Sequence, residues 1–157
     1  MWVSTGAVVT RPLYLAMQAE GLALAGRPDE GLAVLAQAFE MVCQYKEHYH
    51  EAEVRRLTGE LILQSAAQHG QDRSQEAQQW LLGALEFARA HQHHAAALRS
   101  ATSLGRLWQT QGRPQDAWHI LKLEYDAVTE GYYTQDVQAA SALLEQLQLV
   151  SSTPILA

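Results

Sequence analysis

The chain has 157 residues, of which 48% are hydrophobic and 18% charged, and its formal net charge is −6. A mildly acidic chain without a basic stripe does not suit nucleic acid as a partner, and no segment reaches the roughly 18 apolar residues that a membrane helix needs. Cys43 is the only cysteine, which rules out an intramolecular disulfide and fits a reducing cytoplasm, and residues 1–10 lack the pattern of a secretory signal.

Apolar spacing and turn residues predict an all-α chain of about seven helices. We expect an N-terminal extension over residues 1–10, a single helical repeat domain over residues 11–149 and a C-terminal tail over residues 150–157. The domain is predicted to consist of hairpins spanning residues 12–45, 50–90 and 94–129, followed by a capping helix at 134–149. The predicted helices are 12–25, 28–45, 50–68, 74–90, 94–111, 114–129 and 134–149, with Thr10 as the cap of the first.

One turn sequence occurs twice in the chain. The segment Gly26-Arg27-Pro28-Asp29-Glu30-Gly31 returns as Gly112-Arg113-Pro114-Gln115-Asp116-Ala117, and a degraded copy spans Gly70 to Ala77. Each copy places Gly just after one helix, and in the two full copies Pro lies in the first turn of the next helix with an acid near its N-terminus. Repeated turns of this kind predict stacked helical hairpins, and hence a helical repeat solenoid.

Small residues mark the positions where paired helices must approach closely. Gly within a helix costs about 1 kcal/mol relative to Ala, so we attribute Gly59 and Gly105 to close packing. The predicted contacts pair Ala19 with Gly31, Gly59 with Ala77, and Gly105 with Ala117. The second pair is separated by six more positions than the others, and we expect these extra residues to lengthen the turn at residues 69–73.

The third hairpin resembles the tetratricopeptide pattern. Ala101-x-x-Leu104-Gly105-x-x-Trp108, followed by Ala117-x-x-x-Leu121, matches the order of a bulky residue, Leu-Gly, an aromatic, then Ala and a bulky residue. The chain departs from the pattern because Ala101 stands where Trp is typical, no Pro closes the hairpins, and the repeats are longer than usual.

A second likeness extends from about Arg11 to Leu147. The segments that carry it are residues 11–16, 26–28, 51–61, 98–108, 129–132 and 134–136. They are similar to the C-terminal tetratricopeptide-like region of large bacterial signalling proteins, where this region follows a predicted ATPase module and often an adenylate/guanylate-cyclase domain. No cyclase or nucleotide-binding segment occurs here, so the resemblance implies a regulatory or scaffold module without either activity.

In such a stack the first helices of successive hairpins line a concave groove. Away from the packing stripe, these helices carry Met17, Glu20, Leu24, Glu53, Arg56, Glu60, Arg99, Ser103 and Arg106. A groove of mixed charge suits an extended peptide or a segment of a neighbouring protein. Two alternatives remain: a small-molecule sensor that uses the same concave surface, and a module that only associates with itself.

The sequence offers no arrangement of residues suited to catalysis. His91, His93 and His94, like His48 and His50, fall in turns without the converging ligands of a zinc site. We therefore expect no metal, no cofactor and no enzymatic activity. Cys43 follows the apolar stripe of its helix and is predicted to be buried and inert; Trp80, Trp108 and Trp118 are predicted to lie in the core.

The N-terminal end predicts self-association. Residues 1–3 and 7–9 are apolar, and the first helix carries more apolar side chains than one stripe can bury. End repeats of a solenoid need a polar cap or another surface. We therefore expect a homodimer through the first hairpin, with Trp2 or Tyr14 near the contact; the alternative is that residues 1–10 fold back as a cover.

Overall fold

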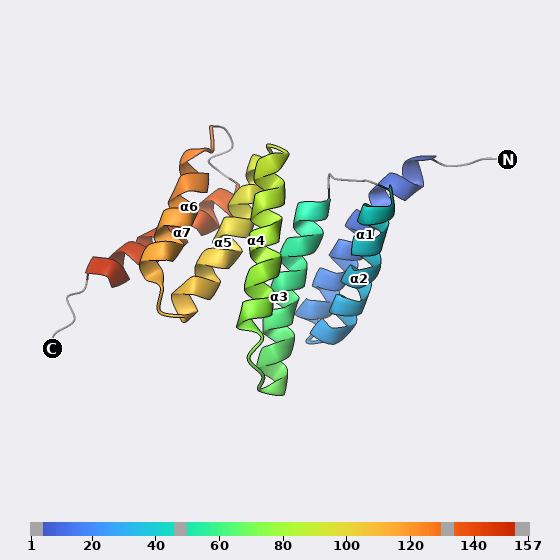
Figure 1. The fold of residues 1–157 in the computed structure, drawn as a ribbon, viewed down its shortest axis with the longest axis horizontal. Helices are drawn as coiled ribbons and strands as arrows, with labels where there is room; N and C mark the ends of the chain where they lie inside the picture. Colours follow the sequence, from blue (N-terminus) through green and yellow to red (C-terminus); the bar gives the residue numbers. More distant parts are fainter. Residues whose placement is uncertain (1–4, 46–49, 130–133, 153–157) are drawn as a thin grey trace. The chain divides into compact units, whose positions relative to one another are not determined.

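The computed structural model of the chain describes residues 5–45, 50–129 and 134–152 (Figure 1). Within these residues the fold is all-helical, as predicted, and has no strand. The helices are α1 (Thr5–Leu24), α2 (Pro28–Tyr45), α3 (Glu51–His69), α4 (Ser74–Ala90), α5 (His94–Thr110), α6 (Pro114–Asp126) and α7 (Gln135–Ser152). Contacts divide the chain into a first unit, residues 1–84, and a second unit, residues 85–157, and each is described by itself.

The repeated turn sequence produces a repeated helix ending. Gly26 adopts φ +77°, and the N–H of Arg27 donates to the carbonyl oxygen of Leu22 at 2.9 Å, which closes α1 with a Schellman motif. Gly70 and Gly112 have the same left-handed backbone, at φ +62° and +71°, and end α3 and α5 in the same way. Glycine suits these positions because it lacks the Cβ that makes a positive φ costly.

The next helix also begins in a repeated way. The carbonyl oxygens of Arg27, Arg73 and Arg113 accept the first helical hydrogen bonds of α2, α4 and α6. Each arginine side chain then pairs with the acid three residues later, as Arg27 does with Glu30 at 2.6 Å. The other pairs are Arg73–Glu76 and Arg113–Asp116. The turn that looks degraded in sequence therefore keeps the ion pair of the other two.

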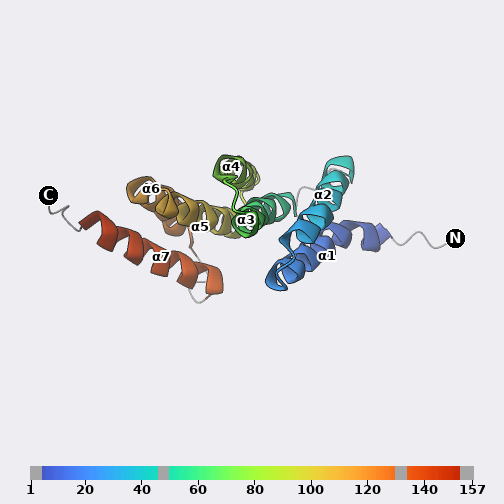
Figure 2. The same cartoon turned by 90° about the horizontal axis from the view of Figure 1, so that it is seen from below.

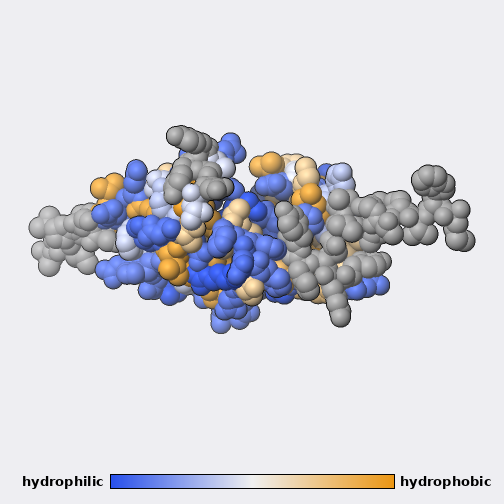
Figure 3. Space-filling view, turned by 90° about the horizontal axis from the view of Figure 1, so that it is seen from above, coloured by the Kyte–Doolittle hydropathy of each residue, from blue (hydrophilic) through white to orange (hydrophobic). Residues whose placement is uncertain are grey.

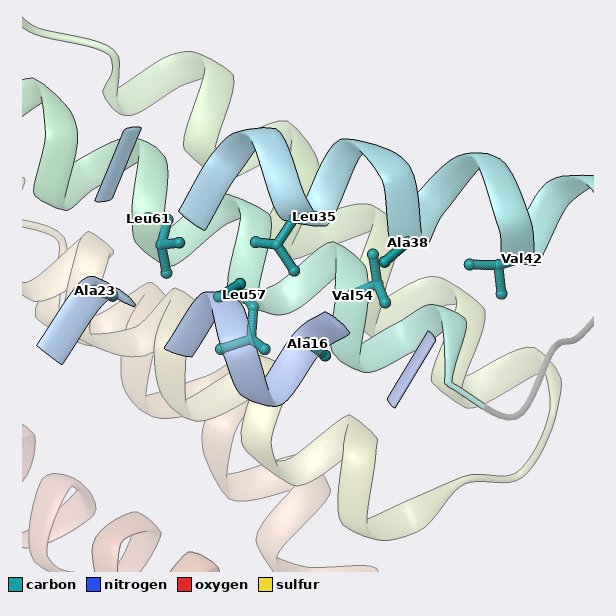
Figure 4. Packing of buried hydrophobic residues seen from close by; sticks show 9 residues of the cluster. Ala16, Ala23, Leu35, Ala38, Val42, Val54, Leu57 and Leu61 are labelled. Carbon is teal, nitrogen blue, oxygen red and sulfur yellow. The ribbon is translucent and has the colours of Figure 1, made fainter. Parts of the chain in front are cut away.

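In the first unit, α3 packs against both helices of the preceding hairpin. Ala16, Ala19 and Ala23 of α1 meet Leu35, Ala38 and Val42 of α2 and Val54, Leu57 and Leu61 of α3 in one buried cluster (Figure 4). Small alanine side chains on α1 let larger residues from the other helices fill the space between them. Figure 2 shows α1 and α2 side by side, joined at the turn of residues 25–27.

The structure places the small residues of each hairpin against each other. A Cβ atom built on Gly31 would lie 3.0 Å from the carbonyl oxygen of Ala19, and one on Gly59 would lie 3.1 Å from that of Ala77. In the second unit, a Cβ on Gly105 would lie 3.7 Å from the carbonyl oxygen of Ala117. The helices therefore approach closely at each of these positions, with least room at the first two glycines.

The second unit repeats the arrangement of the first. Helix α7 packs against both α5 and α6, as α3 does against α1 and α2. Its core contains Ala101 and Leu104 of α5, Leu121 of α6, and Leu143 and Leu147 of α7. Each unit thus contains a helical hairpin and a following helix that covers it, which is the building block of a helical repeat fold.

Helix boundaries mostly agree with the sequence prediction, but α1 does not. It begins at Thr5 and continues through Pro12, so Thr10 lies inside the helix and does not cap it. Proline within a helix removes one backbone donor, yet the ring of Pro12 is fully buried. Trp2, His48 and residues 153–157, named in the sequence predictions, lie outside the described residues.

The extra residues of the second hairpin lie mainly in a helix. Helix α3 continues ten residues beyond Gly59, whereas α1 and α5 continue five beyond Ala19 and Gly105. Only one of the six residues enlarges the turn, which spans residues 70–73. The prediction that they lengthen the turn is therefore wrong for five of them, because the apolar run of α3 keeps packing as far as Ala66.

The predicted burial of Cys43 is also wrong, because its side chain is exposed. The buried face of α2 runs through Leu35, Ala38 and Val42. Successive helical residues are about 100° apart, so the residue after Val42 turns away from the core. Of the predicted core tryptophans, Trp108 is buried, while Trp80 and Trp118 are half-buried.

Candidate functional site

The predicted groove residues divide between the two units. Met17, Glu20 and Leu24 of α1 and Glu53, Arg56 and Glu60 of α3 belong to the first unit; Arg99, Ser103 and Arg106 of α5 belong to the second.

Helix α1 presents an unusual share of exposed apolar side chains. Hydrophilic residues predominate on the face seen in Figure 3, and hydrophobic ones form separate small patches. Among the described residues, the exposed large hydrophobic side chains are Tyr14, Met17, Leu24, Leu123, Leu149 and Val150. Half of them lie on α1, where Met17 is 59% and Leu24 is 86% exposed.

Side-chain amides of α3 fix its position beside α1. Gln64 Nε2 donates to the carbonyl oxygen of Ala23 at 2.8 Å, and Gln68 Nε2 donates to that of Gly26 at 3.2 Å. The Ala23 carbonyl oxygen also accepts from the N–H of Gly26 at 3.0 Å, so Gln64 gives it a second hydrogen bond, and Gln68 binds the turn that follows α1. The residues joined by these bonds are 41 and 42 positions apart in the chain, and the same offset would set Glu20 of α1 near the turn of α3 that carries Glu60.

Helix α3 carries two carboxylates joined by one buried arginine. Arg56 Nη2 lies 2.6 Å from Glu53 Oε1, and Arg56 Nη1 lies 2.8 Å from Glu60 Oε1. The Arg56 side chain is only 10% exposed, while those of Glu53 and Glu60 are 24% and 33% exposed. Arg56 therefore does not face solvent, as a groove residue is expected to; it lies beneath the two acids.

Electrostatics keep Arg56 charged despite its burial. Burial lowers the pKa of the guanidinium, but the hydrogen bond to Glu53 and the charges of Glu60 and Glu53 outweigh it. The net result is a pKa raised above the ordinary value for arginine. Arg56 thus acts as a fixed cation that holds both acids in place along α3.

We call the exposed or half-exposed residues Met17, Glu20 and Leu24 of α1 and Glu53 and Glu60 of α3, the helix against which α1 packs, the α1–α3 face. It combines two well-exposed apolar side chains with three carboxylates, two of which are bridged by Arg56. Within the described residues, Glu20 has no ion-pair partner. The face is therefore apolar and acidic, a combination that suits a partner carrying apolar and basic side chains.

The other acidic and basic residues of α3 have structural partners. Glu51 is buried, and its Oε1 lies 2.5 Å from Arg55 Nη2. The Arg55 guanidinium in turn lies 5.0 Å from the centre of the Phe39 ring, which stands edge-on to Trp80. These contacts tie α2, α3 and α4 together, which favours a structural role for Glu51 and Arg55.

The predicted groove residues of the second unit do not form a cluster open to solvent. Arg99 Nη1 pairs with Asp136 Oδ2 of α7 at 3.0 Å. Ser103 is buried, and its hydroxyl donates to the carbonyl oxygen of Arg99 at 3.1 Å. Only Arg106 is exposed. The contacts of α5 at these positions therefore serve the packing of the second unit.

The second unit contains a pocket of about 290 Å³ at the ends of three helices. Its lining consists of His94, Ala95, Leu98, Ala127, Val128, Thr129, Thr134, Asp136 and Val137. The walls are mainly apolar, and the polar groups are an imidazole, two hydroxyls and a carboxylate. Sequence reasoning missed this pocket because its residues come from three separate helix ends and follow no spaced motif.

The histidines at the α4–α5 turn form contacts typical of a folded turn. The His91 ring stacks on Phe87 with 4.1 Å between centres, and its Nδ1 lies 2.9 Å from the Phe87 carbonyl oxygen. His93 is 5.9 Å from His91, measured between ring centres. In the part of the chain that the structure describes, no group of three or more His, Cys, Asp or Glu residues is placed to hold a metal ion.

None of the described helices combines the length and the apolar character needed to cross a membrane. Comparison of the chain with protein-family models and with curated proteins finds no match. The function must therefore be argued from the α1–α3 face and the pocket themselves.

Proposed function

We propose that this chain is a non-catalytic, tetratricopeptide-like module that binds a protein or peptide segment through the α1–α3 face. The observation that carries the proposal is the exposure of Met17 and Leu24 on α1, which also carries Glu20 and packs against the helix that carries Glu53 and Glu60. Exposed apolar side chains bordered by polar ones are a usual feature of protein interaction sites.

The repeated geometry supports a right-handed solenoid as the setting of this face. Both units pair a hairpin with a covering helix, and the turns share one ending and one Arg–acid pair. Helical repeats of this kind typically use exposed helix faces to bind extended or helical segments. The resemblance to bacterial signalling proteins gives the module a regulatory role, and the single cysteine suits the cytoplasm.

The chemistry of the face defines the partner. Met17 and Leu24 offer apolar contact area, and Glu20 offers a carboxylate with no ion-pair partner among the described residues, so a complementary segment carries apolar residues and Lys or Arg. The interaction should weaken as salt is added, because the charges of the face lie at or near the surface.

Selection from a random peptide library displayed on phage tests this proposal. We expect the immobilised chain to enrich peptides with basic and apolar residues, and their binding to fall at least tenfold in Leu24→Lys and several-fold in Glu60→Gln. The matched control is Leu123→Lys on α6, which changes an exposed leucine of the second unit. If no peptide is enriched, or if Leu24→Lys and Leu123→Lys bind equally well, the proposed face is wrong.

The pocket of the second unit supports a second candidate function, the binding of a small molecule. Its 290 Å³ lies just below the usual range for ligand sites. The Asp136 carboxylate already pairs with Arg99, so the hydroxyls of Thr129 and Thr134 suit a small apolar compound with a hydroxyl group. A fragment library screened by thermal shift tests it: stabilising fragments that lose their effect in Val137→Trp would favour this function.

A further inference from the structure

One line of exposed residues on α1 is self-complementary. Arg11, Tyr14, Met17 and Glu20 follow one another at intervals of three residues, and all four are exposed. A basic residue stands at one end, an acidic residue at the other, and two large apolar side chains lie between them. Tyr14 is 66% exposed, and Met17 nearly as much.

The charges at the two ends of this line form no ion pair with the residues that the structure describes. Among the described residues, neither Arg11 nor Glu20 has an ion-pair partner, although many other arginines pair with a nearby acid. Two unpaired charges that flank exposed apolar side chains favour a partner with the opposite order of charges.

We propose that a second copy of this chain is that partner, and that α1 crosses α1 of the second copy along this line. A two-fold axis perpendicular to the line, between residues 15 and 16, brings Tyr14 opposite Met17 and Arg11 opposite Glu20, and the symmetry repeats both contacts. Arg11 and Glu20 are about two and a half helical turns apart, so Tyr14 and Met17 form the centre of the contact and the two charges lie at its edges. Such an isologous contact joins the same patch on both copies. A two-fold axis along the line would instead place Arg11 beside Arg11 and Glu20 beside Glu20, which is repulsive.

The geometry of the line sets the strength of the contact. Rows of residues three apart are inclined by about 45° to the helix axis, so two helices that pack along them cross steeply. A steep crossing buries little area, and a contact of this size belongs with weak, transient associations. We therefore expect a dimer with a dissociation constant in the range of about 10–100 μM.

This contact can be tested independently of the proposed function, although the two surfaces overlap. Met17 and Glu20 belong to both, so a bound partner and a second copy compete for them. Arg11 belongs only to the self-pairing line, and Glu60 only to the α1–α3 face. Variants at Arg11 therefore test the dimer without altering the proposed partner surface, and Glu60→Gln does the reverse.

A charge-swap experiment on the full chain tests the proposal. Sedimentation equilibrium up to roughly 100 μM should show a monomer–dimer equilibrium for the parent. Arg11→Glu and Glu20→Arg should each weaken dimerisation by about tenfold or more, since each places like charges opposite one another. The double variant Arg11→Glu/Glu20→Arg restores opposite charges in the same register and should recover most of the parent affinity.

The controls and contrary results are specific. Glu145→Arg changes an exposed acid on α7 and should leave dimerisation unchanged, and circular dichroism should show the parent helix content in each variant. A parent that stays monomeric at roughly 100 μM would overturn the proposal. It would also be overturned if the double variant were as weak as the single variants, or if Glu145→Arg weakened the dimer as much as Arg11→Glu.

Discussion

Gly59→Ala separates helix propensity from helix packing, because the two act in opposite directions at this position. Alanine favours a helix over glycine by about 1 kcal/mol. At Gly59, however, the added Cβ would lie 2.8 Å from Leu81 Cγ and 3.1 Å from the carbonyl oxygen of Ala77 on α4. The carbonyl belongs to a helix backbone, so α3 and α4 must move apart. Overpacking of this kind costs about 1–3 kcal/mol.

Gly105→Ala is the matched comparison. Its Cβ would meet Leu143 Cδ2 at 3.4 Å and the carbonyl oxygen of Ala117 at 3.7 Å, which are ordinary contact distances. The propensity gain should then dominate, and the variant should be up to about 1 kcal/mol more stable than the parent. Gly105→Leu should instead lose about 2 kcal/mol, because the longer side chain meets Leu121 and Leu143.

Urea unfolding followed by far-UV circular dichroism measures these differences. We expect Gly59→Ala to be less stable than Gly105→Ala by about 1–3 kcal/mol, because the propensity gain is the same at both sites and only Gly59→Ala carries the overpacking cost. Hydrogen exchange resolved by segment would localise the loss to α3 and α4. If Gly59→Ala were as stable as Gly105→Ala, the close approach of α3 and α4 at Ala77 would be refuted.

Two further predictions concern charged groups. Arg56→Ala should destabilise the chain by about 1–2 kcal/mol in urea unfolding, since it removes the buried cation that joins Glu53 and Glu60. The control Arg106→Ala changes an exposed arginine and should stay within about 0.5 kcal/mol of the parent. Equal effects of the two substitutions would contradict the buried role of Arg56. Hydrogen bonds from Arg27, Ser74 and Arg73 lower the pKa values of Glu30, Asp72 and Glu76. The contribution of these three carboxylates to the free energy of unfolding is therefore complete above the ordinary pKa range of carboxyl groups, and it is lost as pH falls through the lowered pKa values. The urea midpoint should then drop between about pH 5 and pH 3. The drop should be smaller in Glu30→Gln/Glu76→Gln, and an unchanged drop would assign it to other groups.

The helix pattern was readable from the sequence because the turns are local. Gly26 and Gly112, each followed by Arg-Pro, determine a helix end and a helix start within a few residues. The turn between α4 and α5 shows the limit of this reasoning. There Gln92 takes the left-handed conformation, at φ +57°, and no glycine marks the position.

The errors arose where packing between helices overrides a local pattern. Pro12 marks a helix start in sequence, but burial of its ring inside α1 is a tertiary effect. Arg56 looks like a surface residue, and its burial depends on the two acids that neutralise it from the same helix. The pocket beside Asp136 needs three helix ends to be brought together, which no spacing in the sequence predicts.

Amide chemical-shift mapping by NMR, with the peptide that is most strongly enriched in the library selection, tests the proposed function most directly. The account predicts that the largest shifts occur in α1 and α3, around Met17, Leu24 and Glu60, and that Leu24→Lys abolishes them at the same peptide concentration. Shifts confined to the second unit, around His94 and Val137, would contradict the α1–α3 face as the binding site and would favour the pocket.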